Sequence, residues 1–332
     1  MSKSTIIAEE YRGGGLENEH NGIICVLNEQ KEVIYSKGDV EHTPVFYRSA
    51  MKPIQAIPVF DTGIERKYNL ATDEMALFCA SQRGESYHQK SLKSLIEKLD
   101  LSEESLICNE SYPLNESPKI DYICKGHEKR KLLHNCAGKH LGFLAYSREL
   151  GYSIADYGEF NHPIQERIRE EIEVLSEYPK EKMNAGKDGC GVPVYGIPLR
   201  NMALSYLKFV KPEMINDKKK EKVLKRISDT MQAYPEIIAS HDFICTVLLE
   251  DENIIAKGGA QGVYCLALKE EKISIALKVQ SGTELLWPLV VAEILKKINY
   301  KNKQTIDNLY KLRSTKILSD AGEVVGETKI IL

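Results

Sequence analysis

Near the N-terminus the sequence reads Gly22-Ile23-Ile24-Cys25-Val26-Leu27, then Asn28-Glu29-Gln30-Lys31, then Glu32-Val33-Ile34-Tyr35-Ser36. Two short runs rich in β-branched residues and separated by four polar residues predict a β-hairpin. The C-terminal third has the same character, with strand-like runs at Phe243–Leu249, Asn253–Lys257, Gly262–Leu268 and Ile273–Val279. We therefore expect an antiparallel sheet built from both ends of the chain.

Between these ends, apolar residues recur at helical spacing. The predicted helices are Ser49–Phe60, Asp73–Cys79, His88–Leu99, Lys139–Leu150, Pro163–Leu175, Pro198–Phe209 and Lys220–Ala233. Strands and helices that are segregated along the chain favour an α+β fold. Because no Pro/Gly/Ser-rich linker interrupts the chain, we expect one domain over residues 1–332. Its mainly helical block, about 49–235, is inserted between sheet segments 11–48 and 236–332.

Composition favours a soluble enzyme. The chain has 332 residues, of which 42% are hydrophobic, and a net charge of −3, so neither nucleic acid nor an anionic membrane is an expected partner. Residues 1–10 lack the apolar run of a secretory signal, which predicts a cytoplasmic protein. The apolar stretch Leu285–Leu295 contains Pro288 and Glu293 and is too short to span a bilayer, so it predicts a buried helix.

Two cysteine segments concentrate metal-binding residue types. They are His134-Asn135-Cys136-Ala137-Gly138-Lys139-His140 and Asp188-Gly189-Cys190-Gly191-Val192-Pro193. Thiolate and imidazole are the ligands that zinc prefers, so residue type alone suggests Cys136, Cys190, His134 and His140. Lys139 would share a helical face with Cys136 but must first lose a proton, at a cost of about 4–5 kcal/mol at pH 7. The ordinary role of any of the eight cysteines is a small buried apolar residue.

A Ser-x-x-Lys motif occurs at Ser49-Ala50-Met51-Lys52. One helical turn would bring the lysine amine to the serine hydroxyl, where a neutral amine can remove the hydroxyl proton. A second match, Ser205 to Lys208, lies in an apolar segment that predicts a packed helix. Ser49 follows an extended segment, so a helix N-cap is the alternative explanation for it.

Two further loops carry polar side chains beside apolar elements. Ala80-Ser81-Gln82-Arg83-Gly84-Glu85 follows a predicted helix, and its serine, arginine and glutamate are candidates for a cleft. Ala256-Lys257-Gly258-Gly259-Ala260-Gln261-Gly262 ends a predicted strand, and its glycines would let a ligand approach the backbone closely. An ordinary loop or turn accounts for each of these segments taken alone.

Taken together, these five ordered motifs resemble the rhizobial-type L-asparaginase family. The resemblance extends from about Arg12 to Leu295. It implies a fold similar to serine β-lactamases and glutaminases, hydrolysis of L-asparagine to L-aspartate and ammonia, and a homodimer.

The same resemblance implies roles for individual residues. It pairs Ser49 with Lys52 and Ser81 with Lys257 as catalytic residues, with Ser49 as the expected nucleophile. It places Zn²⁺ on Cys136, Lys139 and Cys190, with His134 and His140 in support and Cys245 as a further cysteine near the metal. We expect the substrate to contact Arg48, Arg83, Glu85, Asn135, Asp188 and Gly259.

The sequence departs from the family pattern at two positions. Gln82 stands where the family usually has histidine, and Gln261 stands where it has glutamate. Both changes bear on substrate preference. Three alternatives to an asparaginase therefore stay open: a glutaminase, a penicillin-recognising serine hydrolase, and a non-catalytic zinc- or redox-responsive binding protein.

Overall fold

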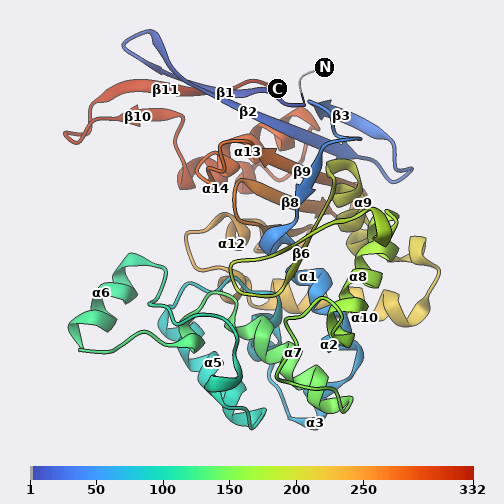
Figure 1. Cartoon of the computed structure of the whole chain (residues 1–332). Coiled ribbons are helices and arrows are strands. Elements are labelled where there is room, and N and C mark those ends of the chain that lie inside the picture. Colours follow the sequence, from blue (N-terminus) through green and yellow to red (C-terminus); the bar gives the residue numbers. More distant parts are fainter. Residues whose placement is uncertain (1–2) are drawn as a thin grey trace. The chain divides into compact units, whose positions relative to one another are not determined.

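The computed structural model describes residues 3–332, which form two compact units (Figure 1). The first unit comprises residues 3–50, 197–210 and 242–332, and the second comprises residues 51–196 and 211–241. Each unit is therefore assembled from segments that are distant in the sequence.

The first unit contains most of the strands. Its strands are β1 (Thr5–Arg12), β2 (Gly15–Leu27), β3 (Val33–Lys37), β4 (Pro44–Phe46), β7 (Ile254–Gly258), β8 (Val263–Leu268), β9 (Ile273–Val279), β10 (Lys316–Leu318) and β11 (Val324–Ile330). Its helices are α9 (Leu199–Val210), α12 (Ile244–Leu249), α13 (Trp287–Lys297) and α14 (Lys303–Leu312).

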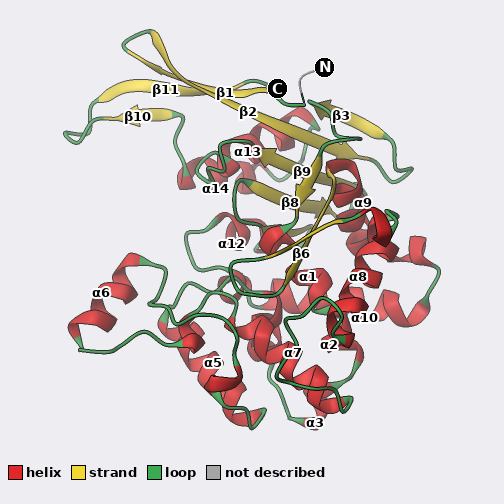
Figure 2. Ribbon diagram, in the orientation of Figure 1, coloured by secondary structure: helices red, strands yellow, loops and turns green. Residues whose placement is uncertain are grey.

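An eight-stranded antiparallel sheet organises this unit (Figure 2). Its order is β10-β11-β1-β2-β9-β8-β7, and β3 also pairs with β2. The predicted hairpin is confirmed, with Cys25 opposite Ser36 on β3 and opposite Ala276 on β9. Strands from the two ends of the chain are thus direct neighbours, as the sequence predicts.

The buried half of β2 explains the unbroken apolar run from Ile23 to Leu27. All five residues are fully buried, which requires cover on both faces of the sheet. Helix α9 packs against β2, β8 and β9, α12 packs against β7, and α13 packs on α14. The core of the first unit lies between these helices and the sheet.

One predicted strand of the C-terminal third is wrong. Phe243–Leu249 contains helix α12, not a strand. Five of the six α12 residues are buried, and a short run that is apolar on every side has no periodicity to distinguish a strand from a helix. The helix expected at Leu285–Leu295 is present as α13.

The second unit is mainly helical. It contains α1 (Lys52–Gln55), α2 (Ile57–Asp61), α3 (Ile64–Lys67), α4 (Thr72–Ala76), α5 (Ser86–Lys98), α6 (Glu116–Cys124), α7 (Ala137–Glu149), α8 (Pro163–Ser176), α10 (Lys218–Ala233) and α11 (Pro235–Ile238). Strand β5 (Asn184–Lys187) pairs with β6 (Pro193–Pro198), which leads back into the first unit.

Helix α7 is the centre of the second unit. Its residues from Ala137 to Ser147 are all buried, and it packs against α2, α5, α8 and the 3₁₀ turn Leu77–Cys79. A β-carbon at Gly138 would lie 2.4 Å from the carbonyl oxygen of Leu77, so this close approach requires glycine. The start of α7 is thereby fixed against the segment that leads into Ser81.

No helix within residues 3–332 is both long and apolar enough to cross a membrane.

Candidate active site

Ser49 lies in the 3₁₀ turn Arg48–Met51, which runs directly into α1. Residues three apart in such a turn lie one above the other, so Ser49 and Lys52 share one side of the segment. The expectation that Ser49 caps the helix is wrong, because Met51 is the N-cap of α1. The turn begins earlier, with a hydrogen bond of 3.1 Å from the Ala50 amide to the Tyr47 carbonyl.

The second Ser-x-x-Lys match is part of the core. Ser205 is fully buried in α9, accepts a hydrogen bond from the Tyr47 hydroxyl (2.9 Å) and donates one to the Met202 carbonyl (2.7 Å). Ser49, by contrast, is partly exposed. Of the two serines, only Ser49 is accessible to solvent.

The end of β7 lies beside the turn that carries Ser49. A β-carbon at Gly259 would lie 2.7 Å from the Tyr47 carbonyl oxygen and 3.4 Å from the Ala50 nitrogen. Lys257, two residues earlier, is buried, and its Nζ donates to the Gly258 carbonyl (2.7 Å). The first unit therefore holds Ser49 and the Lys257 strand end as neighbouring segments.

Cys245 supports this strand end from α12. Its sulfur accepts hydrogen bonds from the Gly258 amide (3.2 Å) and from the Tyr264 hydroxyl (3.4 Å). Cys245 is fully buried, so these contacts fix the backbone conformation next to Lys257.

In the second unit, Lys52 is a buried amine with three acceptors. Its Nζ donates to the Ala80 carbonyl (2.6 Å), the Ser81 hydroxyl oxygen (2.9 Å) and the Asn135 carbonyl (3.3 Å). Burial lowers the pKa of Lys52, and the neighbouring Cys136 opposes that shift. The structure thus brings Lys52 together with Ser81, the serine for which the sequence predicts Lys257 as a partner.

Gln82 holds the Ser81 loop in place. Its amide nitrogen donates to the carbonyls of Leu133 (2.8 Å) and His134 (3.0 Å), and its amide oxygen accepts from the Gly84 amide (2.6 Å). The side chain is 1% exposed, so all of these bonds are made away from solvent. Gln82 therefore joins the Ser81 loop to the loop that precedes Cys136.

Arg83 and Glu85 are linked by Asn115, a residue that the sequence analysis missed. Arg83 Nε donates to the Asn115 side-chain oxygen (2.5 Å), and the Asn115 amide nitrogen donates to Glu85 (2.6 Å) and Ser240 (3.1 Å). Asn115 is the N-cap position of α6, and its place before Glu116 was the only signal in the sequence. That signal predicts a helix start, not a contact with the candidate site.

Cys136, Lys139 and Cys190 converge in the second unit. Lys139 Nζ lies 3.1 Å from the Cys190 sulfur, and all three residues are buried. A hydrogen bond with Cys190 and the charges of Lys52 and Lys139 lower the pKa of Cys136 well below its ordinary value. Burial disfavours the Lys139 ammonium, but Cys190 and Cys136 outweigh it and raise the pKa of Lys139. The cluster therefore combines an easily formed thiolate with a buried cation.

The two cysteine sulfurs of this cluster are of the donor type that zinc prefers, and Lys139 would add a nitrogen donor only after loss of its proton. Within residues 3–332, no group of three or more His, Cys, Asp or Glu side chains could hold a metal, so the residues of this cluster would form a zinc site only if Lys139 also served as a donor. His140 is fully buried, and its Nε2 has no hydrogen-bond partner in that part of the chain.

The remaining predicted residues shape the same cluster. His134 accepts a hydrogen bond from the Cys136 amide (3.1 Å), and His140 Nδ1 lies 2.7 Å from the Tyr157 hydroxyl. Asn135 contributes its carbonyl to Lys52. The Asp188 side chain accepts from the Gly189 amide (2.8 Å) in the turn that presents Cys190.

The site thus contains a buried lysine hydrogen-bonded to a serine, Lys52 with Ser81. The sequence profile described as L-asparaginase II matches residues 8–330. The chain therefore belongs to the L-asparaginase II family. This membership indicates an enzyme that acts on amides. A search of curated proteins finds no significant sequence match.

Two solved structures resemble this chain at low sequence identity. One is a β-lactamase (Mb2281c) from Mycobacterium bovis, at 12% identity and a TM-score of 0.40, over 83% of this chain and 94% of that one. Another is a LovD6 mutant of simvastatin synthase (LovD) from Aspergillus terreus, at 13% identity and a TM-score of 0.36, over 78% of this chain and 86% of that one.

Proposed function

We propose that the protein hydrolyses the side-chain amide of L-asparagine to L-aspartate and ammonia. Membership of the L-asparaginase II family supports amide hydrolysis. The observation that supports the mechanism is the position of the buried Lys52 amine. This amine is hydrogen-bonded to Ser81, and Lys52 follows Ser49 by one helical turn along the chain.

In the first half of the reaction, the Ser49 oxygen attacks the amide carbon. Lys52, in its neutral form, takes the hydroxyl proton as the new C–O bond forms. The proton passes to the amide nitrogen, the C–N bond breaks and ammonia leaves. Backbone N–H groups at the 3₁₀ turn, including that of Ser49, stabilise the developing oxyanion. An ester on Ser49 remains.

In the second half, water attacks the ester carbon and the Ser49 oxygen regains a proton. Lys52, neutral again after ammonia has left, takes this proton from the attacking water and passes it to the Ser49 oxygen as the ester C–O bond breaks and L-aspartate is released. The hydrogen bond between Lys52 and Ser81 supports Ser81 as the proton relay in both halves. We assign Lys257 as the second lysine of this relay, as the family resemblance implies.

The family resemblance assigns the substrate contacts to Arg48, Arg83, Glu85, Asn135, Asp188 and Gly259. The presence of both positive and negative side chains among them suits the α-carboxylate and α-ammonium groups of an amino acid. Glu85 and Arg83 are both anchored through Asn115, which fixes the separation of their opposite charges.

Cys136, Lys139 and Cys190 would hold Zn²⁺, with Lys139 bound as the neutral amine. When bound, the ion supplies a localised positive charge that polarises and orients an oxygen or nitrogen ligand. We assign the ion no role in proton transfer, so Ser49 and Lys52 carry the bond-making steps.

The test is ammonia release by the purified protein from L-asparagine, L-glutamine and D-asparagine, with zinc content determined by elemental analysis. We expect L-asparagine to be the best substrate. Higher turnover of L-glutamine would identify a glutaminase, and nitrocefin hydrolysis would identify a penicillin-recognising enzyme. Bound zinc with no ammonia from either amide would identify a binding protein. The predicted homodimer is tested in the same preparation by sedimentation velocity, and the predicted cytoplasmic location by cell fractionation.

A further inference from the structure

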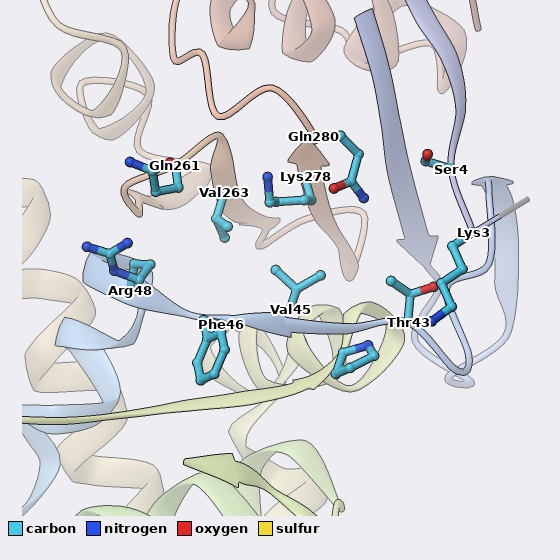
Figure 3. Close-up of a pocket in the computed structure, with 11 residues that line it drawn as sticks. Lys3, Ser4, Thr43, Val45, Phe46, Arg48, Gln261, Val263, Lys278 and Gln280 are labelled. Carbon is cyan, nitrogen blue, oxygen red and sulfur yellow. The ribbon is translucent and has the colours of Figure 1, made fainter. Parts of the chain in front are cut away.

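Arg48 is the one charged residue assigned to the substrate that belongs to the first unit. It lines a cavity of about 600 Å³ in that unit, at the same end as Gln261 (Figure 3). The other charged residues assigned to the substrate, Arg83, Glu85 and Asp188, belong to the second unit. Recognition of opposite charges by the second unit therefore depends on how its own loops hold these side chains.

Arg83 and Glu85 lie on the loop that carries Ser81. Exposure alternates along residues 81–85, because Ser81, Arg83 and Glu85 are partly exposed whereas the two residues between them are buried. Alternation with this period is typical of an extended segment. The loop thus presents two opposite charges together with Ser81, the serine that is hydrogen-bonded to Lys52.

Asn115 holds both of these charges from a different segment. Its side-chain oxygen accepts from Arg83 Nε (2.5 Å), and its side-chain nitrogen donates to Glu85 (2.6 Å) and to the buried Ser240 (3.1 Å). The Asn115 backbone amide also donates to the Arg83 carbonyl (3.0 Å). A primary amide accepts and donates but carries no charge. Asn115 therefore binds a cation and an anion together without neutralising either.

Asn115 is the N-cap of α6, which makes these contacts unusual. An asparagine at this position ordinarily accepts a hydrogen bond from an amide of the first turn, and such a cap contributes about 1 kcal/mol. Within residues 3–332, the Asn115 side chain makes no cap bond, and no residue of α6 is buried to compensate for it. Asn302, the N-cap of α14, does accept from the Thr305 amide (3.4 Å). A departure from a local rule is expected where the residue has another role.

We propose that Asn115 is a specificity-determining positioning residue, which holds Arg83 and Glu85 so that they recognise the α-carboxylate and α-ammonium groups of the substrate together. The substrate class is then side-chain amides of free α-amino acids. This inference rests on the proposed function, because that function assigns Arg83 and Glu85 to the substrate. A carboxamide that lacks either α-group would leave one of the two held charges without its partner in the complex, which disfavours binding of that carboxamide.

The test uses three carboxamides: L-asparagine, succinamate, which lacks the α-ammonium group, and β-alaninamide, which lacks the α-carboxylate. Ammonia release gives kcat/KM for each of them. We expect the unchanged protein to prefer L-asparagine over either analogue by about 10³-fold or more. Asn115→Leu removes both side-chain bonds at similar shape and should lower each preference by about tenfold or more, with a higher KM for L-asparagine. Asn115→Gln keeps the amide and should recover part of the lost preference.

A second variant and a matched control separate positioning from stability. Asn115→Ser keeps a residue type that is favoured at N-caps and is too short to join the two charges, so it tests the proposal if the leucine variant fails to fold. Asn302→Leu is the control, because it removes an N-cap asparagine that does cap its helix. It should lower the melting temperature and leave both preferences unchanged.

An equal loss of turnover on all three carboxamides in the Asn115 variants, with both preferences unchanged, would show a purely structural role and overturn the proposal. Comparable turnover of succinamate and L-asparagine by the unchanged protein would also overturn it, because the α-ammonium group would then not be recognised. Both results would leave amide hydrolysis standing. No ammonia from these carboxamides or from L-glutamine would instead reject the proposed function, and this inference with it.

Discussion

The Nζ of Lys52 lies 2.9 Å from the hydroxyl oxygen of Ser81, although 29 residues separate them in the sequence. Lys52 is also one turn of continuous helical structure from Ser49. The lysine that the motif spacing pairs with Ser49 is thus hydrogen-bonded to Ser81, for which the family resemblance implies Lys257 as the partner. This relationship gives the two serines different expected responses to substitution.

Ser49→Ala should reduce ammonia release from L-asparagine by about 10³-fold or more, because it removes the atom that forms the ester. Ser81→Ala should cost about 10- to 100-fold, because it removes a proton relay and leaves the nucleophile. Steady-state kinetics on both variants measures this difference. Ser117→Ala on the exposed face of α6 is the control. The reverse order of effects would make Ser81 the nucleophile, with Lys52 as its base.

Lys52→Met should reduce turnover by about 10³-fold or more, because no other group in the proposed mechanism accepts the serine proton. Methionine matches the length and apolar stem of the buried lysine, so the variant should retain its fold. Lys93→Met controls for the loss of one surface charge. Near-normal activity in folded Lys52→Met protein would contradict the role of Lys52 as base.

Cys136→Ser and Cys190→Ser should each lower the zinc content of the purified protein to a small fraction of one ion per chain. Replacing sulfur by a hydroxyl removes one of three protein donors. Elemental analysis measures the change directly, independently of activity. Cys124→Ser is the matched control, because Cys124 is exposed on α6 whereas Cys136 and Cys190 are buried. Full zinc content in both variants would mean that these cysteines are not ligands.

His88 should make the protein less stable in acid. Its Nδ1 accepts from the Glu85 amide (3.2 Å), and its Nε2 lies 3.1 Å from the Glu236 carbonyl, so the ring must be neutral in the folded state. Burial lowers the pKa of His88 to about 4, and the charges of His241 and Arg83 act in the same direction. Because the unfolded ring has a pKa near 6.5, the unfolded chain binds the proton first as pH falls.

The stability associated with neutral His88 is therefore fully present above about pH 6.5 and is lost between pH 6.5 and 4, by about 3 kcal/mol in total. Urea unfolding across this range measures the loss. His88→Gln lacks the titrating group, so its free energy of unfolding should fall less steeply over the same interval. Identical pH dependence in the two proteins would rule out His88 as the source.

Much of the sheet was predictable from the sequence, and the reason is visible in β2 and β3. Their apolar runs are bounded by polar turns, so the strand type and the antiparallel pairing of the two strands follow from local pattern. The register, which has an irregularity between Val26 and Leu27, does not. Helix α12 was not predictable in this way, because an apolar run buried on all sides carries no period.

In the candidate site, too, contacts within one helical turn were predictable from the sequence and contacts between distant loops were not. Spacing within one helical turn indicated Ser49 with Lys52 and Cys136 with Lys139, since neighbours on a helix are fixed by the backbone. The contact of Lys52 with Ser81 and the anchoring of Glu85 by Asn115 depend on loops that meet only in the folded chain. No local pattern encodes such contacts, which explains why Asn115 was missed.

Gln82, which stands where the family usually has histidine, is expected to be a positioning residue for the Ser81 loop. Gln82→Leu leaves two carbonyls and one amide of buried backbone without their partner, at a cost of about 1–3 kcal/mol for each unsatisfied group. Gln89→Leu is the matched comparison, because it removes one bond to the same loop, from Gln89 to the Gly84 carbonyl (2.8 Å).

We expect Gln82→Leu to lower both the melting temperature and kcat, and Gln89→Leu to have a small effect on each. Gln82→His should restore kcat more than Gln82→Leu does, because an imidazole can still donate to one of the two carbonyls. A melting temperature lowered in Gln82→Leu with kcat unchanged would show that Gln82 supports the fold without positioning Ser81.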